Sequence, residues 1–179
     1  MIVAGCGPTV YTVKPPSVPT IGVNDVCRHF IPTYLLVIDK PQKFEGDRFH
    51  YIKNCPSVVF HAERHNPTLA NQVERSVLFK IVKAKYGQVV MPKDGVFSAF
   101  KDCPYAALQL ALWMGATEIG FIGVDHTGDH PKLGRLAFEI TAQYKLMKEF
   151  LEEKDVRLVK LAEQSRLPFD YVPYEEWNA

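Results

Sequence analysis

The hydrophobic positions of this chain are gathered in short continuous runs, each of which stops at a polar or glycine-containing segment. Ile2–Ala4, Thr20–Val23, Tyr34–Ile38 and Ser57–Phe60 are such runs in the first third of the sequence. Uninterrupted apolar runs of this length are typical of strands that are buried on both faces, as in parallel sheets. We therefore predict that these four segments are strands of a parallel-dominated sheet.

Around Pro104 the apolar pattern changes from strand to helix and then back to strand. Residues 106–114 are apolar almost throughout and stop at Gly115, which predicts a buried helix that begins near Pro104. Glu118–Val124 then predicts a central strand, whose glycines would let backbone or ligand approach closely. We expect this strand to be a neighbour of the three strands nearest the N-terminus.

The remaining segments continue the alternation of strand and helix. Gly134–Lys154 carries apolar side chains every three or four residues, which predicts a helix with one buried face. Val156–Leu161 predicts a last strand, and Tyr174–Trp177 a short helical turn. The middle of the chain is less regular, because Glu74–Lys85 fits either a helix or a hairpin strand. Gln88–Met91 predicts a short strand.

Strands that alternate with helices over 179 residues define the expected architecture. We predict an α/β, Rossmann-like fold with a mostly parallel central sheet and helices on both faces. No repeat, low-complexity segment or convincing linker divides the sequence, so residues 1–179 are expected to form a single domain.

The composition argues against several classes of function. Lys plus Arg number 21 and Asp plus Glu 20, and this net charge of +1 argues against a protein that mainly binds nucleic-acid phosphates. No apolar run approaches the ~20 residues of a membrane span, and the N-terminus lacks the pattern of a signal peptide. The four cysteines have no zinc-ligand spacing, so we interpret them as reduced thiols of a cytoplasmic protein.

Polar residues directly follow several of the predicted strands. The carboxyl ends of parallel strands meet at one edge of a sheet, and ligands bind in the crevice there. Taken together, these residues therefore favour a shared site over separate capped turns. The candidate ligand-binding residues at this edge are Gly5, Gly7, Pro8, Thr9, Asn24, Asp25 and Asp39.

The loop Gly5–Thr9 has the composition of a phosphate-binding turn. Glycines bring backbone N–H groups close to phosphate oxygens, and Thr9 adds a hydroxyl donor. A side chain at Gly7 would occupy the space where we expect the phosphate. The loop matches neither the G-x-G-x-x-G pattern nor the P-loop, and a plain turn would look similar.

Asn24 and Asp25 allow two interpretations. An amide at the end of a strand can read a base or a ribose through its paired donor and acceptor. The alternative is that these residues cap a short helical turn at Val26–His29. One residue could serve each role, and the sequence leaves both interpretations open.

The densest polar cluster is Asp125–His130. Two histidines and two carboxylates within six residues suit metal binding or acid–base chemistry. Lys132 and Arg135 follow, and they suit a phosphate charge but are equally ordinary at a surface. The alternative reading is that His126 caps a turn and His130 points to solvent.

In combination these segments resemble the bacterial sialyltransferase-like group, which includes the archaeal 6-hydroxymethylpterin pyrophosphokinase-like proteins. The resemblance rests on the G-x-G-P-T loop at Gly5–Thr9 and on Asn24 after the second strand. It also rests on the alanine-rich helix that ends at Gly115, before a strand that finishes Gly123-Val124-Asp125. It covers residues 1–40 and roughly residues 103–130.

This resemblance implies a nucleotide-binding domain and a transferase that uses a nucleotide-activated donor. It implies that Asp125 ends the strand on the ligand side and that a histidine after it is the catalytic base. Asp125 is the remaining catalytic residue that the resemblance implies. His130 is the best positional match for this base, and His126 is the next. The residues that would contact the nucleotide are Gly7, Thr9 and Asn24.

Three functions follow as hypotheses. The first is a glycosyltransferase-like enzyme that binds a nucleotide sugar, requires no cofactor and uses a histidine base. The second is a pyrophosphokinase, in which ATP and Mg²⁺ bind the same loops and Asp25, Asp39 and Asp125 hold the metal. The third is a nucleotide-binding module without enzymatic activity.

Overall fold

Parallel strands form the centre of the structure. The computed structural model describes residues 1–63, 72–126 and 134–177. Within these ranges one nine-stranded sheet has the order β6-β5-β4-β3-β2-β1-β7-β8-β9, and every neighbouring pair is parallel. The strands are β1 (Ile2–Ala4), β2 (Thr20–Val23), β3 (Tyr34–Val37), β4 (Val58–Ala62), β5 (Ser76–Lys83), β6 (Val96–Ala99), β7 (Glu118–Ile122), β8 (Arg157–Lys160) and β9 (Asp170–Tyr171).

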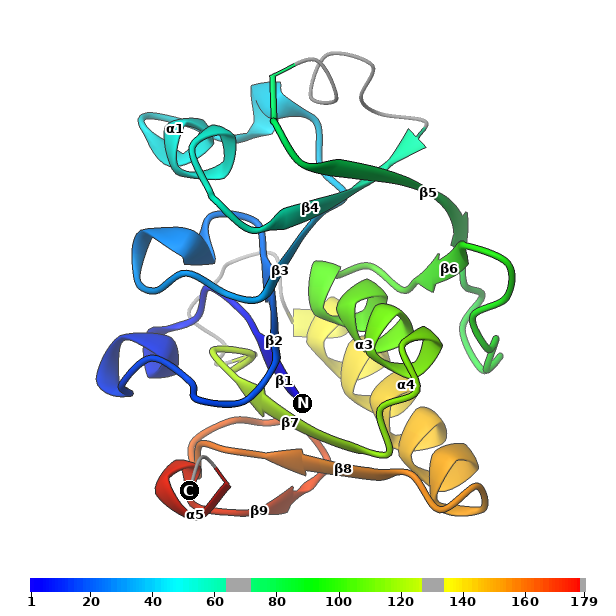
Figure 1. Ribbon diagram of the computed structural model, residues 1–179. Coiled ribbons are helices and arrows are strands. Elements are labelled where there is room, and N and C mark those ends of the chain that lie inside the picture. The colour runs from blue at the N-terminus through cyan, green and yellow to red at the C-terminus, as the bar shows by residue number, and fades with distance from the viewer. Residues whose placement is uncertain (64–71, 127–133, 178–179) are drawn as a thin grey trace.

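Helices cover both faces of this sheet, as expected from the sequence (Figure 1). Two long helices, α3 (Cys103–Trp113) and α4 (Gly134–Glu152), lie on one face. Short helices lie on the other, namely α1 (Arg48–Lys53), α5 (Tyr174–Trp177) and the 3-10 helices η1 (Pro8–Thr12), η2 (Val26–Arg28) and η3 (Pro41–Lys43). None of the helices described is long and apolar enough to cross a membrane.

Successive side chains of each central strand enter two different cores. In β1, Val3 packs with the helices α3 and α4, whereas Ile2 and Ala4 belong to the core on the opposite face. All three residues are fully buried. This alternation is the normal geometry of a strand, and the two cores explain why the strand sequences are continuous apolar runs.

The sheet reverses its direction of growth beside β1. The chain first adds strands from β1 outward to β6, and α3 then returns it to β7 on the other side of β1. The predicted neighbourhood of the first three strands and the strand after α3 is therefore confirmed, in the order β3-β2-β1-β7. Such a reversal opens a crevice at the carboxyl ends of the two strands that flank it.

The middle of the chain corrects two sequence predictions. Glu74–Lys85 contains β5, which pairs in parallel with β4 and β6 and is neither a helix nor part of a hairpin. Gln88–Met91 is not a strand. The strand in this region is β6, because its Phe97 and Ala99 are buried in the α3 core, whereas Gln88–Met91 is largely exposed.

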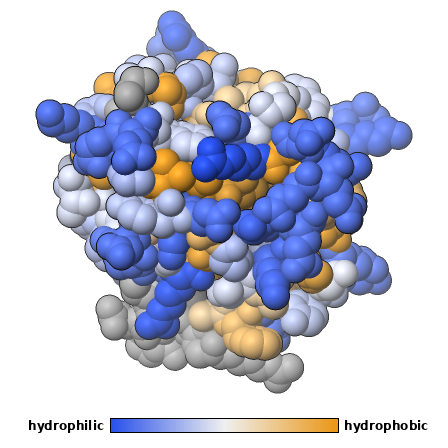
Figure 2. Space-filling model, turned by 90° about the horizontal axis from the view of Figure 1, so that it is seen from below, coloured by the Kyte–Doolittle hydropathy of each residue, from blue (hydrophilic) through white to orange (hydrophobic). Residues whose placement is uncertain are grey.

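The outer edge of the sheet at β9 differs from its buried centre. Both residues of β9 are exposed, and the surface seen from this side is mainly hydrophilic (Figure 2). A two-residue strand with polar surroundings offers little template for another chain, which is a common way to protect a sheet edge.

The burial of α3 yields a stability prediction. Leu108 lies on α3 in the core and is 0% exposed, whereas Leu146 on α4 is 36% exposed. Leu108→Ala is expected to lower the free energy of unfolding by about 2–5 kcal/mol, because it leaves a cavity in the core. Leu146→Ala is the matched control and is expected to cost much less. Urea unfolding of both variants measures the difference, and equal losses would contradict the packing described here.

Candidate functional site

A cavity of about 690 Å³ lies at the carboxyl ends of β1, β2 and β7. Its walls are the loop after β1, the residues after β2, the N-terminal end of α3 and the segment after β7. This is the crevice that the reversal of strand order creates. Six of the residues predicted from the sequence line it together, namely Gly5, Gly7, Pro8, Asn24, Asp125 and His126.

Three other predicted residues, Thr9, Asp25 and Asp39, do not line this cavity. Asp25 contacts the thiol of Cys6, and Asp39 contacts the thiol of Cys103. Thr9, at the end of the loop Gly5–Thr9, is buried. His130, Lys132 and the side chain of Arg135 lie outside the described residues.

Thr9 and Asp125 lock the loop after β1 to the segment after β7. The backbone N–H of Thr9 donates to Asp125 Oδ2 at 3.0 Å, and its hydroxyl donates to Oδ1 at 2.5 Å. The same hydroxyl accepts from the backbone N–H of Gly123 at 2.9 Å. Because the Thr9 hydroxyl already has these partners, the donor expected for a phosphate is occupied by protein. The geometry also favours a positioning role for Asp125, which is only 3% exposed.

Gly7 is required by this close approach of the two loops. Its N–H donates to the carbonyl of Gly123 at 2.7 Å. A Cβ at Gly7 would lie 2.5 Å from Asp125 Oδ2 and 2.7 Å from the Gly123 carbonyl oxygen. The space expected for a phosphate at that Cβ position is therefore filled by protein atoms. A side chain at Gly7 would displace the loop itself, so it would affect stability as well as any ligand.

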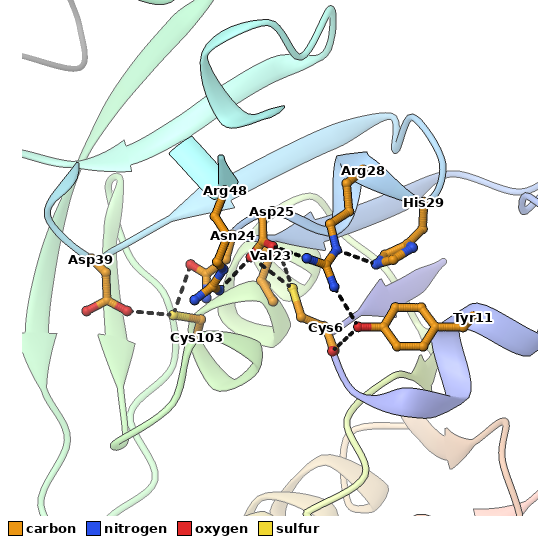
Figure 3. A network of polar contacts seen from close by, with 10 residues as sticks. All are labelled: Cys6, Tyr11, Val23, Asn24, Asp25, Arg28, His29, Asp39, Arg48 and Cys103. Carbon is orange, nitrogen blue, oxygen red and sulfur yellow. Dashed lines mark hydrogen bonds and ion pairs between the residues drawn. The ribbon is translucent and has the colours of Figure 1, made fainter. Parts of the chain in front are cut away.

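Asn24 and Asp25 follow β2 and have separate environments. Asn24 has a φ of 53°, and its Oδ1 accepts from the Cys103 thiol at 3.5 Å. The expected helical turn forms as η2, but the Asp25 side chain does not cap it. Instead its carboxylate lies 2.6 Å from Arg48 Nη2 and 3.6 Å from Arg28 Nη1 (Figure 3). Burial alone would raise the pKa of Asp25, but the hydrogen bond and charge of Arg48 outweigh burial and lower it.

His126 and Asp102 face each other at the opposite side of the cavity. His126 Nε2 lies 3.3 Å from Asp102 Oδ2. The same carboxylate oxygen accepts from the hydroxyl of Tyr144 at 3.1 Å, and Oδ1 accepts from the Tyr105 N–H at 3.0 Å. Asp102 is thus the N-cap of α3 and is held on both oxygens.

The other imidazole nitrogen of His126, Nδ1, has different surroundings from Nε2. Nδ1 is buried and has no hydrogen-bond partner among the described residues. A carboxylate opposite Nε2 favours the tautomer in which Nε2 carries the proton and Nδ1 can accept one. Buried polar atoms without a partner are uncommon in proteins; among the described residues, His61 and Gln109 also have such atoms. The backbone of His126 is left-handed, with a φ of 47°.

Asp102 was not among the residues that sequence reasoning selected. The signal for it was its position two residues before Pro104, because an Asp just ahead of a proline is a common pattern at the start of a helix. That pattern predicts a cap but not a histidine beside it. Asp102 and His126 meet because α3 begins at the same edge of the sheet at which β7 ends.

The two cysteines of the cavity wall are unsuited to nucleophilic chemistry. Burial, followed by the charge of Asp25, raises the pKa of Cys6 to about 12. Burial and the charge of Asp39 likewise raise the pKa of Cys103 well above its ordinary value. All four cysteines of the chain are free thiols. Because the thiolate is the reactive form, these two thiols are inert near neutral pH.

The carboxylates that a Mg²⁺ site would use already have protein partners. Asp25 is paired with arginines and Asp125 with Thr9, while Asp39 lies 2.7 Å from Lys43 Nζ. In the described part of the chain, no group of three or more His, Cys, Asp or Glu residues is placed to hold a metal ion. This arrangement lends no support to the pyrophosphokinase alternative.

The fold has a counterpart among solved structures. The sialyltransferase CstII from Campylobacter jejuni, in complex with the substrate analogue CMP-3FNeuAc, matches with a TM-score of 0.52 and 15% sequence identity. The match covers 96% of this chain and 84% of that chain. This chain has the fold of that sialyltransferase.

Other comparisons add little to this finding. A second structure of CstII, with cytidine-5'-monophosphate, matches with a TM-score of 0.46 and 15% identity and covers 93% of this chain and 80% of that chain. No known family profile matches the sequence, and no curated protein matches it significantly.

The hydrogen bonds between Thr9 and Asp125 yield a second stability prediction. Thr9→Val removes the hydroxyl and leaves one oxygen of the buried Asp125 without its donor. It is expected to lower the free energy of unfolding by about 1–3 kcal/mol. Thr117→Val, at an exposed position before β7, is the matched control and is expected to change little. Thermal or urea unfolding gives both values, and a neutral Thr9→Val would show that the lock is unimportant.

Proposed function

We propose that this chain is a nucleotide-dependent transferase of glycosyltransferase-like type, which binds a nucleotide sugar in the cavity. The observation that carries the proposal is the convergence of the His126–Asp102 pair with Asn24 and the Gly5–Pro8 loop around one cavity. The fold supports it as an analogy, because the sialyltransferase with this fold was solved with CMP-3FNeuAc. Residues 1–179 would then act as a single nucleotide-binding domain.

In the proposed reaction, His126 is the general base. Nδ1 takes the proton of an acceptor hydroxyl, and the acceptor oxygen attacks the anomeric carbon of the donor sugar. The bond between that carbon and the phosphate oxygen breaks, and the nucleotide leaves with the electron pair. Asp102 holds the ring in position and stabilises the imidazolium that forms.

The remaining predicted residues have supporting parts in this proposal. Asn24 offers an amide to the base or ribose, and Asp125 keeps the loop after β1 in place through Thr9. His130 remains the second candidate for the base. For Lys132 and Arg135, which lie outside the described residues or have an undescribed side chain, binding of a phosphate stays a prediction from the sequence.

A ligand screen tests the proposal directly. Nucleotides and nucleotide sugars are added to the protein in a thermal-shift assay, with Mg²⁺ or with EDTA. A ligand at one hundred times its dissociation constant stabilises the folded state by about 2.7 kcal/mol. We expect at least one nucleotide sugar to raise the melting temperature equally in both conditions. Stabilisation that EDTA abolishes would favour metal-dependent chemistry, and no stabilisation by any of them would contradict nucleotide binding.

Substitution of the proposed base separates catalysis from binding. His126→Asn is expected to lower kcat by about 10²–10⁴-fold, because it removes the proton acceptor. Nucleotide binding by this variant should remain close to that of the wild type. His50→Asn, at an exposed position of α1, is the control and should keep full activity. Turnover that survives His126→Asn would assign the base to another residue.

A further inference from the structure

The charged groups in and beside the cavity are unevenly distributed. At the end formed by α3 and β7, the charged side chains are the carboxylates of Asp102 and Asp125. His126 lines the same end and contacts Asp102. Neither carboxylate has a Lys or Arg partner among the described residues. A phosphate at this end would meet two negative charges at short range.

Beside the cavity, next to the end of β2, the charged groups have the opposite character. Asp25 lies between Arg28 and Arg48, so one carboxylate balances two guanidinium groups and a formal charge of +1 remains. Figure 3 shows Arg48 in this network between Asp39 and Arg28. The network reaches the cavity wall through Cys6, whose thiol lies 3.7 Å from Asp25 Oδ1.

The two arginines differ in how many donors they have left. Arg28 is held on all three nitrogens, since Nε donates to His29 at 2.8 Å, Nη2 to Tyr11 at 3.0 Å, and Nη1 lies 3.6 Å from Asp25. Its guanidinium also lies over the ring of Tyr11. Arg28 is therefore part of the scaffold and has little capacity for a ligand.

Arg48 has unused donors and is partly open to solvent. Only Nη2 has a partner among the described residues, which is Asp25 Oδ1 at 2.6 Å. The side chain is 38% exposed, and the ring of Phe44 supports the guanidinium at 5.4 Å. A guanidinium has five N–H donors in a planar fork that matches phosphate oxygens, so most of this capacity is free.

We propose that Arg48 is an anion-binding residue that receives the phosphate group of the nucleotide at the β2 side of the cavity. The inference rests on the proposed function and deepens it, because it orients the donor. The phosphate lies near Arg48 and Asn24, and the transferred group extends toward His126. Asp25 holds the guanidinium ready for the phosphate, which completes the charge balance of the cluster.

Isothermal titration calorimetry with inorganic pyrophosphate, and separately with CMP, tests this assignment. Arg48→Met is expected to weaken pyrophosphate binding by about tenfold to a hundredfold, the usual worth of hydrogen bonds to a charged group. Arg48→Lys keeps the positive charge but lacks the planar guanidinium, so its affinity for pyrophosphate should lie between those of the wild type and Arg48→Met. Arg157→Met removes an exposed arginine beside Glu118, at the amino ends of β7 and β8, and should bind like the wild type.

Asp25→Asn distinguishes ligand binding from a structural role. Arg48→Met and Asp25→Asn break the same ion pair, so a purely structural arginine predicts that both weaken pyrophosphate binding. An anion-binding Arg48 predicts opposite effects, because Asp25→Asn removes a competing carboxylate and should strengthen binding. The melting temperature of each variant confirms that it is folded at the temperature of the titration.

The outcomes separate this inference from the proposed function. If pyrophosphate binding depends on Arg48 but no nucleotide binds, Arg48 is an anion site and the transferase proposal fails. If CMP binds equally well to the wild type and to Arg48→Met, the transferase proposal survives and the assignment of Arg48 is overturned. The absence of pyrophosphate binding by the wild type would also overturn it.

Discussion

The contact between Thr9 and Asp125 is the interaction on which the candidate site depends. It joins two loops whose residues are 116 positions apart in the sequence, at the point where the sheet reverses its direction of growth. The lock is tight because Gly7 brings the loop after β1 against the Gly123 carbonyl without a Cβ between them. Because the two loops are joined, the cavity wall has a defined shape. His126 is the next residue after Asp125, so its position depends on the same contact.

The carboxylates near the cavity are alike in type but differ in what surrounds them. Asp125 accepts two hydrogen bonds from Thr9, Asp25 is paired with Arg48 and Arg28, and Asp102 caps α3 beside His126. Each therefore has a separate task, which is to join loops, to hold cations, or to orient an imidazole. A buried charge without such partners would cost several kcal/mol, so these pairings are also what allows so many charges at one edge.

The likeness to a sialyltransferase is a likeness of fold, at 15% identity. One fold can support unrelated reactions, because activity depends on the side chains at a site and not on the sheet that holds them. The case for a transferase therefore rests on this chain's own groups, namely the paired His126 and Asp102 and the partly free guanidinium of Arg48. The imidazole lines the cavity, and the guanidinium lies beside the cavity on its β2 side, where it contacts Asp25. A ligand with both a phosphate and a reacting carbon fits such an arrangement.

The sequence by itself determined the central strands and long helices, because residues buried on two faces leave a local pattern of apolar runs. Ile2–Ala4 and Thr20–Val23 could be read in this way, and the gathering of Gly7, Asn24 and His126 at one edge followed from parallel order. Local patterns do not record contacts between distant segments. The pairing of Asp25 with Arg48, of Asp102 with His126 and of Asp125 with Thr9 was decided only by the tertiary structure, because each pair meets through strand order and helix placement. The same reason explains the incorrect strand at Gln88–Met91, since only packing against α3 selected Val96–Ala99 instead.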